Sequence, residues 1–156
     1  MKRNKTALDT ALHLLGYRAQ SEKEIRTKLR QRGYAPGEIE ETVKTLCEHH
    51  YLDDEDAAGE LFEYYRREGL YGNRYIRQKM QMRGLPCDFA LTPEEETEKA
   101  TEALRKKEAT NPGYRENYKR AFGFLARRGF SFEAIRHAME SEPDAEHESE
   151  WDDDVR

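Results

Sequence analysis

Hydrophobic residues recur at helical spacing along most of this chain, and one short pattern of residues occurs three times. Each copy has an apolar residue four positions before a glycine, an arginine directly before it, and an aromatic residue or leucine directly after it. The glycines are Gly33, Gly84 and Gly129, which are 51 and 45 residues apart, and six positions after them come Ile39, Ala90 and Ile135. Steps of this size are typical of stacked supersecondary units. The sequence therefore predicts a repeat protein.

Each repeated glycine is expected to end a basic helix. The apolar residue four positions earlier faces the core, and the glycine takes up the left-handed conformation that terminates many helices. In the first copy Ser21 and Glu24 stand at the spacing of a capping box, which predicts a helix from about Glu22 to Arg32. Pro36 suits the first turn of the following helix.

Periodic apolar stripes place the other helices. The stripe upstream of the first basic helix comprises Ala7, Leu8, Ala11, Leu12 and Leu15. The helix after it carries Ile39, Val43 and Leu46, and the helix that follows the aspartate cap at Asp53 and Asp54 carries Ala57, Ala58, Leu61, Phe62 and Tyr65. A short helix is predicted from Pro86 to about Leu91.

The last third of the chain shows the same signals. Thr92, Pro93 and Glu95 predict the start of a long charged helix, and Asn111-Pro112-Gly113 breaks it. Another apolar face follows, and Ser131 caps a final helix. No convincing strand is found. The fold class expected is all-α.

Composition favours several small cores over one large core, because 36% of the 156 residues are hydrophobic and 38% are charged. We predict three tandem three-helix repeats in an elongated arrangement, in which each repeat packs against its neighbour. Their expected bounds are residues 5–51, 52–92 and 93–140. No apolar run approaches the ~18 residues of a membrane span, and the N-terminus lacks an apolar signal region. A cytoplasmic protein without membrane association is expected.

The net charge of -5 is concentrated at the C-terminus, where residues 141–156 hold one arginine against eight acidic residues. This composition predicts a disordered acidic tail. The tail either keeps the protein soluble or lies over the basic helices and competes with a polyanion.

The repeated helices carry cations that leave their apolar faces free. Such a recurring basic surface either is a solvated helix face favoured by the helix dipole or follows a polyphosphate strand or an acidic protein surface. The candidate binding residues are Arg26, Lys28, Arg30, Arg32, Arg74, Arg77, Lys79, Arg83, Lys119, Arg127 and Arg128.

Catalytic and metal chemistry is not expected. The acidic run from Asp53 to Asp56 is typical of a helix start, and the adjacent His49 and His50 point about 100° apart on a helix, so they cannot share a metal. No phosphate-binding glycine loop, nucleophile elbow or HExxH motif occurs. Cys47 and Cys87 are expected to be reduced thiols. No catalytic residue, metal or cofactor is therefore predicted.

Each repeat contributes residues to a combined pattern. The first repeat contributes Ala11–Leu15, Arg18, Ser21, Glu24, Ile25, Lys28, Leu29, Gly33 and Tyr34. The second contributes Tyr51–Asp54, Arg66, Gly72, Ile76, Arg77 and Gly84, and the third contributes Phe124–Ser131. Over about residues 6–140, the order and spacing of these residues resemble the RecX family, the bacterial regulators of the RecA recombinase.

This resemblance implies a curved, elongated molecule that lodges in the groove of a RecA filament on single-stranded DNA. It further implies inhibition of recombinase, ATPase and coprotease activities, and we expect the chain to act as a monomer. Two alternatives remain open. One is a direct binder of single- or double-stranded DNA that uses its basic helices as recognition helices. The other is a protein adaptor that involves no nucleic acid.

Overall fold

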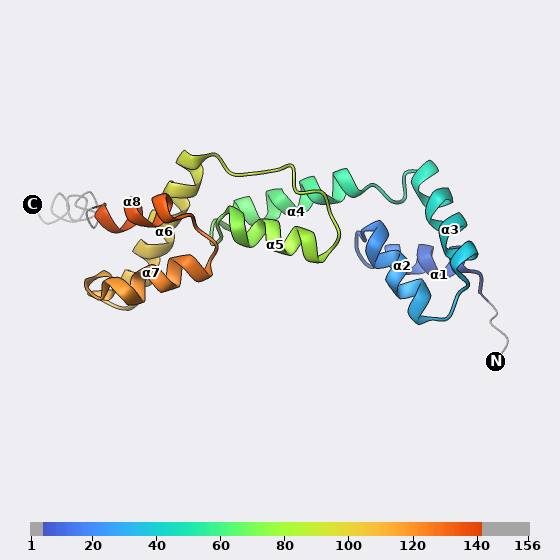
Figure 1. Ribbon diagram of the computed structural model, residues 1–156, viewed down its shortest axis with the longest axis horizontal. Coiled ribbons are helices and arrows are strands. Elements are labelled where there is room, and N and C mark those ends of the chain that lie inside the picture. Colours follow the sequence, from blue (N-terminus) through green and yellow to red (C-terminus); the bar gives the residue numbers. More distant parts are fainter. Residues whose placement is uncertain (1–4, 142–156) are drawn as a thin grey trace, which may run out of the picture. The chain divides into compact units, whose positions relative to one another are not determined.

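The computed structural model describes residues 5–141, and this part of the chain is helical without any strand, which confirms the all-α prediction. The first five helices are α1 (Ala7–Leu15), α2 (Glu22–Gln31), α3 (Pro36–Glu48), α4 (Asp54–Glu68) and α5 (Asn73–Met82) (Figure 1). They are followed by α6 (Pro93–Thr110), the 3-10 helix η1 (Tyr114–Glu116), α7 (Tyr118–Arg127) and α8 (Phe132–Glu140). The predicted acidic tail lies outside the described residues, apart from Ser141.

The chain folds into two compact units that share the second predicted repeat between them. Of the described residues, the first unit takes in 5–64 together with Arg77–Phe89. The second takes in Tyr65–Ile76 and residues 90–141. Because the division falls inside α4 and α5, both helices contribute to both units. The repeat bounds expected from the sequence stay a prediction.

Helix starts lie where the capping signals predict them. The Ser21 hydroxyl accepts a hydrogen bond from the Glu24 N–H, and the Glu24 carboxylate accepts one from the Ser21 N–H, each at 3.0 Å. Thr92 and Ser131 cap α6 and α8 in the same manner, by accepting a hydrogen bond from the third residue that follows. These bonds satisfy N–H groups that a helix start leaves unpaired.

The three repeated glycines all terminate helices in the left-handed conformation, with φ angles of 83°, 73° and 84°. In each copy the residue after the glycine donates its N–H to the carbonyl of the apolar residue four positions before the glycine. The clearest case is Leu85 N–H to Met80 O, at 2.9 Å. This is the hydrogen bond of a Schellman motif, and it confirms the predicted helix stops.

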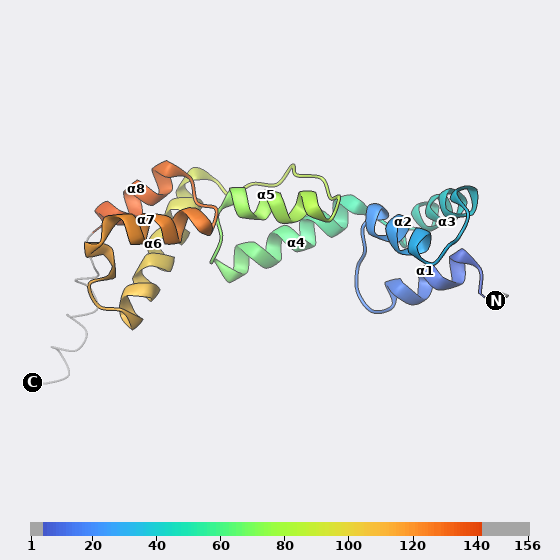
Figure 2. The ribbon, with the colours of Figure 1, turned by 60° about the horizontal axis from the view of Figure 1, so that its bottom comes forward.

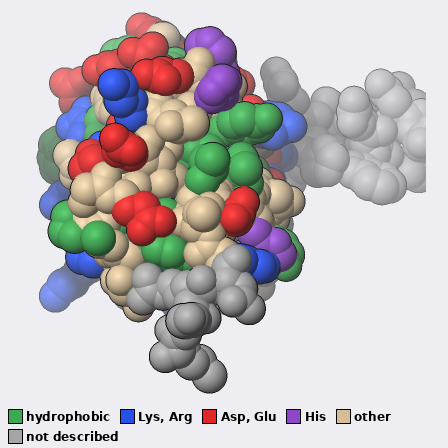
Figure 3. All heavy atoms as spheres, turned by 90° about the vertical axis from the view of Figure 1, so that its right-hand side faces the viewer, with side chains coloured by type: hydrophobic (Ala, Val, Ile, Leu, Met, Phe, Trp, Pro, Cys, Tyr) green, Lys and Arg blue, Asp and Glu red, His purple; other side chains and the backbone are tan. Residues whose placement is uncertain are grey.

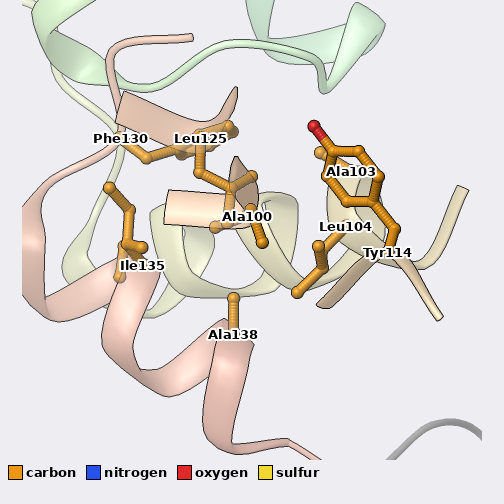
Figure 4. Packing of buried hydrophobic residues seen from close by; sticks show 10 residues of the cluster. Ala100, Ala103, Leu104, Tyr114, Leu125, Phe130, Ile135 and Ala138 are labelled. Atoms are coloured by element: carbon orange, nitrogen blue, oxygen red, sulfur yellow. The ribbon is translucent and has the colours of Figure 1, made fainter. Parts of the chain in front are cut away.

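Two hydrophobic cores are built mainly from these helices. Within the first unit, α1, α2 and α3 enclose Ala7, Ala11, Ile25, Leu29, Tyr34, Ile39, Val43, Leu46 and Leu52. Within the second, α6, α7 and α8 lie together (Figure 2) and bury ten residues, eight of them labelled in Figure 4. Ala100, Ala103 and Ala138 have small side chains, which let α6 and α8 approach closely. The predicted stripe of α1 is only partly buried, because Leu12 remains 38% exposed.

The short helix predicted from Pro86 to about Leu91 is wrong, because residues 85–92 are not helical. Ala90 is exposed there, although its counterparts Ile39 and Ile135 are buried. In the first unit the Phe89 ring stacks on Phe62 at a centroid distance of 5.6 Å. A helix between Gly84 and Thr92 would form too few hydrogen bonds to offset the free-energy cost of helix nucleation. Burial of the small Ala90 side chain would add little stabilisation to such a helix.

None of the helices within residues 5–141 is both long and apolar enough to cross a membrane.

Candidate functional site

Some cations of the basic helix α2 contact other side chains of the protein, and others are exposed to solvent. Arg26 forms an ion pair with Glu40 of α3, with 3.0 Å between Nε and Oε1, and this hydrogen bond raises the pKa of Arg26. Lys28 donates a hydrogen bond to the buried Gln20 side chain at 2.7 Å. Arg30 and Arg32 are exposed. Their guanidinium groups are therefore the ones α2 offers to a binding partner.

In α5, Arg74 and Arg77 are exposed and Lys79 is half-buried, whereas Arg83, which directly follows α5, belongs to the packing of the first unit. The Arg83 guanidinium lies 2.9 Å from the Glu24 carboxylate and donates to the Ala19 carbonyl at 3.1 Å. Burial acts to raise the pKa of Glu24, but the Ser21 N–H and Arg83 outweigh it, so that this pKa lies below its ordinary value.

In α7, Lys119 and Arg127 are exposed, and Arg128 at its end is half-buried. The Arg128 guanidinium lies over two rings of the second unit, at 5.2 Å from the Phe124 centroid and 5.4 Å from the Tyr71 centroid. Such contacts are attractive cation–π interactions that hold the arginine in place.

The arginine before each repeated glycine thus has three different environments. Arg32 is exposed, Arg83 is bound to Glu24, and Arg128 lies against aromatic rings. The repeat pattern places these residues at equivalent positions, but it does not predict what each side chain contacts. Exposed cations remain on all three basic helices, and their binding role stays a prediction.

Cations do not gather on every face. The face shown in Figure 3 carries prominent acidic side chains interspersed with apolar ones, and few Lys or Arg side chains. On α3, which contributes no candidate binding residue, Glu38, Glu40, Glu41 and Glu48 are all exposed.

Sequence reasoning missed a group of cations on α6. Lys106, Lys107 and Arg128 line a pocket of about 170 Å³ in the second unit, together with Phe124 and Thr110. The sequence predicts α6 as a long charged helix and assigns none of its cations to a binding surface. The signal available was the order of charges along α6, with acids at its start and Arg105-Lys106-Lys107 toward its end.

Within the described part of the chain, no three His, Cys, Asp or Glu side chains lie close enough together to hold a metal ion. Cys47 lies beside Glu22, with 2.9 Å between Sγ and Oε1. Burial, followed by this acidic neighbour, raises the pKa of the Cys47 thiol to about 11. A protonated thiol is a poor nucleophile, so this site is unsuited to thiolate chemistry.

The chain matches two parts of a known family. Residues 7–46 match the first three-helix domain of RecX, and residues 94–139 match its third three-helix domain. The first match spans α1 to α3, and the second spans α6 to α8.

Curated relatives and solved structures agree with these matches. The regulatory protein RecX of Vibrio vulnificus is 34% identical over 140 residues, which cover 86% of this chain and 91% of the relative. The regulatory protein RecX of Deinococcus radiodurans is 34% identical over 148 residues, covering 88% of this chain and 71% of the relative. The crystal structure of RecX from Lactobacillus salivarius has the same fold, with a TM-score of 0.74 at 20% identity over 86% of this chain and 92% of that one. This chain therefore belongs to the RecX family of regulatory proteins.

Proposed function

We propose that this chain binds the filament that RecA forms on single-stranded DNA and inhibits its recombinase, ATPase and coprotease activities. The observation that carries the proposal is the likeness to regulatory proteins named RecX over 86% of the chain. The chain would act in the cytoplasm as a monomer, lodged in the filament groove and without catalytic chemistry of its own.

Exposed cations on three successive basic helices support this proposal. The exposed cations are Arg30 of α2 and Arg32 at its C-cap, Arg74 and Arg77 of α5, and Lys119 and Arg127 of α7. Guanidinium and ammonium groups that recur along the chain suit a negatively charged partner, such as a filament that combines acidic protein surface with a phosphate strand. Binding would weaken as salt rises.

The alternative of direct DNA binding rests on the same cations and predicts affinity for naked DNA with a steep salt slope. The exposed glutamates of α3 argue against a strong general DNA binder. An adaptor that involves no nucleic acid would be insensitive to both DNA and RecA.

RecA's ATP hydrolysis on single-stranded DNA separates these functions. The chain is titrated in below stoichiometric amounts, and its binding to the same DNA without RecA is measured in parallel. We expect hydrolysis to fall at concentrations that leave naked DNA unbound. If hydrolysis falls only once the DNA is coated, direct DNA binding replaces the proposal, and if it never falls the proposal is wrong.

A further inference from the structure

The pocket in the second unit combines positive charge with aromatic surface. It lies where the end of α6 meets α7 and the residue Leu70, which follows α4, and it has a volume of about 170 Å³. Lys106 and Lys107 reach it from α6, and Arg128 reaches it from the end of α7. Phe124 and Thr110 also line the pocket.

No carboxylate lines this pocket. Glu102 of α6 instead forms an ion pair with Arg105 at 2.5 Å, and Glu108 pairs with Arg115. The hydrogen bond from Arg105 lowers the pKa of Glu102, so it stays ionised and engaged near neutral pH. Three cations therefore share a concave site without a matching acid, which favours an anionic ligand.

Aromatic rings hold two of these cations in place. The Lys107 ammonium lies 5.3 Å from the Phe124 centroid, and the Arg128 guanidinium lies over both the Phe124 and Tyr71 rings. Tyr71 is itself stacked on Tyr75 with a centroid distance of 3.9 Å and an interplanar angle of 9°. The charged groups are thus positioned before any ligand arrives, which reduces the entropy lost on binding.

We propose that this pocket binds a backbone phosphate of single-stranded nucleic acid, with the neighbouring base lying against the aromatic surface at its edge. Its volume is well below the ~300 to 1,000 Å³ of small-molecule sites, so it suits one group of a longer chain rather than a free cofactor. Cations next to aromatic rings are the combination that single-strand binders use, because unpaired bases expose their faces for stacking. An acidic protein segment would use the cations but not the rings.

The inference goes beyond the proposed function because this contact needs no RecA, and it is expected at protein concentrations above those that inhibit RecA's ATP hydrolysis. Its test uses the full chain and a fluorescently labelled oligothymidylate, with anisotropy recorded between about 50 and 200 mM salt. The variant Lys106→Ala/Lys107→Ala removes two pocket cations and keeps good helix formers in α6. The matched control Lys44→Ala/Arg136→Ala removes the same charge from exposed positions on α3 and α8, outside the pocket lining. Thermal unfolding of all three proteins confirms that they are folded.

The pocket variant is expected to bind the oligonucleotide about five- to tenfold more weakly, and its salt slope should fall by about 0.7, corresponding to the one phosphate that the pocket holds. The control variant should bind like the wild type. The proposal is overturned if both variants lose affinity equally, or if the wild type does not bind the oligonucleotide. It is also overturned if duplex DNA binds as tightly or if polyglutamate displaces the oligonucleotide equally well. RecA's ATP hydrolysis, measured separately, reports on the proposed function, so the two can fail independently.

Discussion

Glu24 and Arg83 are 59 positions apart in the sequence, yet the Arg83 guanidinium donates to the Glu24 carboxylate at 3.0 Å. Glu24 is also the carboxylate of the α2 capping box. A single side chain thus closes the start of one basic helix and anchors the end of another within the first unit.

Replacing Arg83 should therefore destabilise the protein, whereas replacing its counterpart Arg32 should not. Arg83→Ala removes the half-buried bonds to Glu24 and to the Ala19 carbonyl, and we expect a loss of about 1 to 2 kcal/mol in the free energy of unfolding. Arg32→Ala, at the equivalent exposed position, should change it by less than about 0.5 kcal/mol. Urea denaturation of both variants measures the difference, and equal losses would contradict the role given to Arg83.

The same carboxylate should make stability depend on acid. The pKa of Glu24 is lowered from its ordinary 4.5 in the folded protein, so the ionised group contributes stability that is present above this pH and is lost as the pH falls through the folded pKa. Glu24→Gln keeps an acceptor for the capping box but removes the charge. The variant should be less stable than the wild type at pH 7, and the difference should shrink below about pH 4.5. Unfolding curves from pH 7 down to about 3 test this, and a constant difference would exclude Glu24 as the source.

Gly129 is expected to tolerate no side chain. Its φ angle is 84°, and a Cβ there would lie 2.5 Å from the Cβ of Tyr75. Gly129→Ala adds this clash to left-handed strain, for a loss of about 3 kcal/mol or more. Gly69→Ala is the control, because Gly69 has a φ of 67° and its nearest neighbour is the flexible end of Lys99, 3.6 Å away. The control should lose only about 1 to 2 kcal/mol. If the two variants have comparable unfolding midpoints, the clash between the new Cβ at position 129 and Tyr75 does not destabilise the protein and the prediction is wrong.

Glu96 of α6 is 4% exposed and accepts hydrogen bonds from two helix starts in the second unit. The donors are Asn73 N–H at 3.2 Å and Ser131 N–H at 2.6 Å. Glu96→Ala leaves both groups without this acceptor and should lower the free energy of unfolding by about 2 to 4 kcal/mol. Glu96→Gln retains one carbonyl oxygen and should lie between the wild type and the alanine variant, as measured by chemical denaturation. If the two variants are equally stable, the bonds to Glu96 are not the cause.

The exposed cations of α2 are expected to matter for inhibition and not for stability. Arg30→Ala/Arg32→Ala should raise the concentration needed to inhibit RecA's ATP hydrolysis by about five- to tenfold, since two charge contacts are lost. The unfolding midpoint should stay close to that of the wild type, because both side chains are exposed. Lys44→Ala/Arg136→Ala serves again as the charge-matched control. Inhibition that weakens equally in both variants would point to net charge alone.

The sequence predicted local structure well because local signals determine it. Ser21, Thr92 and Ser131 cap helices as expected, and Gly33, Gly84 and Gly129 end them. These features depend on hydrogen bonds and steric limits within a few residues, which the sequence order itself displays.

Contacts between distant residues could not be read in this way. The bond between Glu24 and Arg83, the double acceptor role of Glu96 and the meeting of Lys107 with Phe124 all depend on which helices pack together. The missing helix after Gly84 has a similar cause. There Phe89 packs on Phe62, so tertiary contacts decide the conformation of a segment whose own helix propensity is weak.

The interleaving of the two units has a consequence for synthesis. Chains emerge from the ribosome N-terminus first, and the first unit includes Arg77–Phe89, whereas Tyr65–Ile76 belongs to the second. The first unit therefore cannot complete itself until Phe89 has left the exit tunnel, and by then a piece of the second unit is exposed without its partners. A nascent chain halted in this region would contain α1 to α3. The hydrogen bond between the Glu24 carboxylate of α2 and Arg83 would not yet have formed. Completion of the first unit is thus tied to translation beyond Phe89.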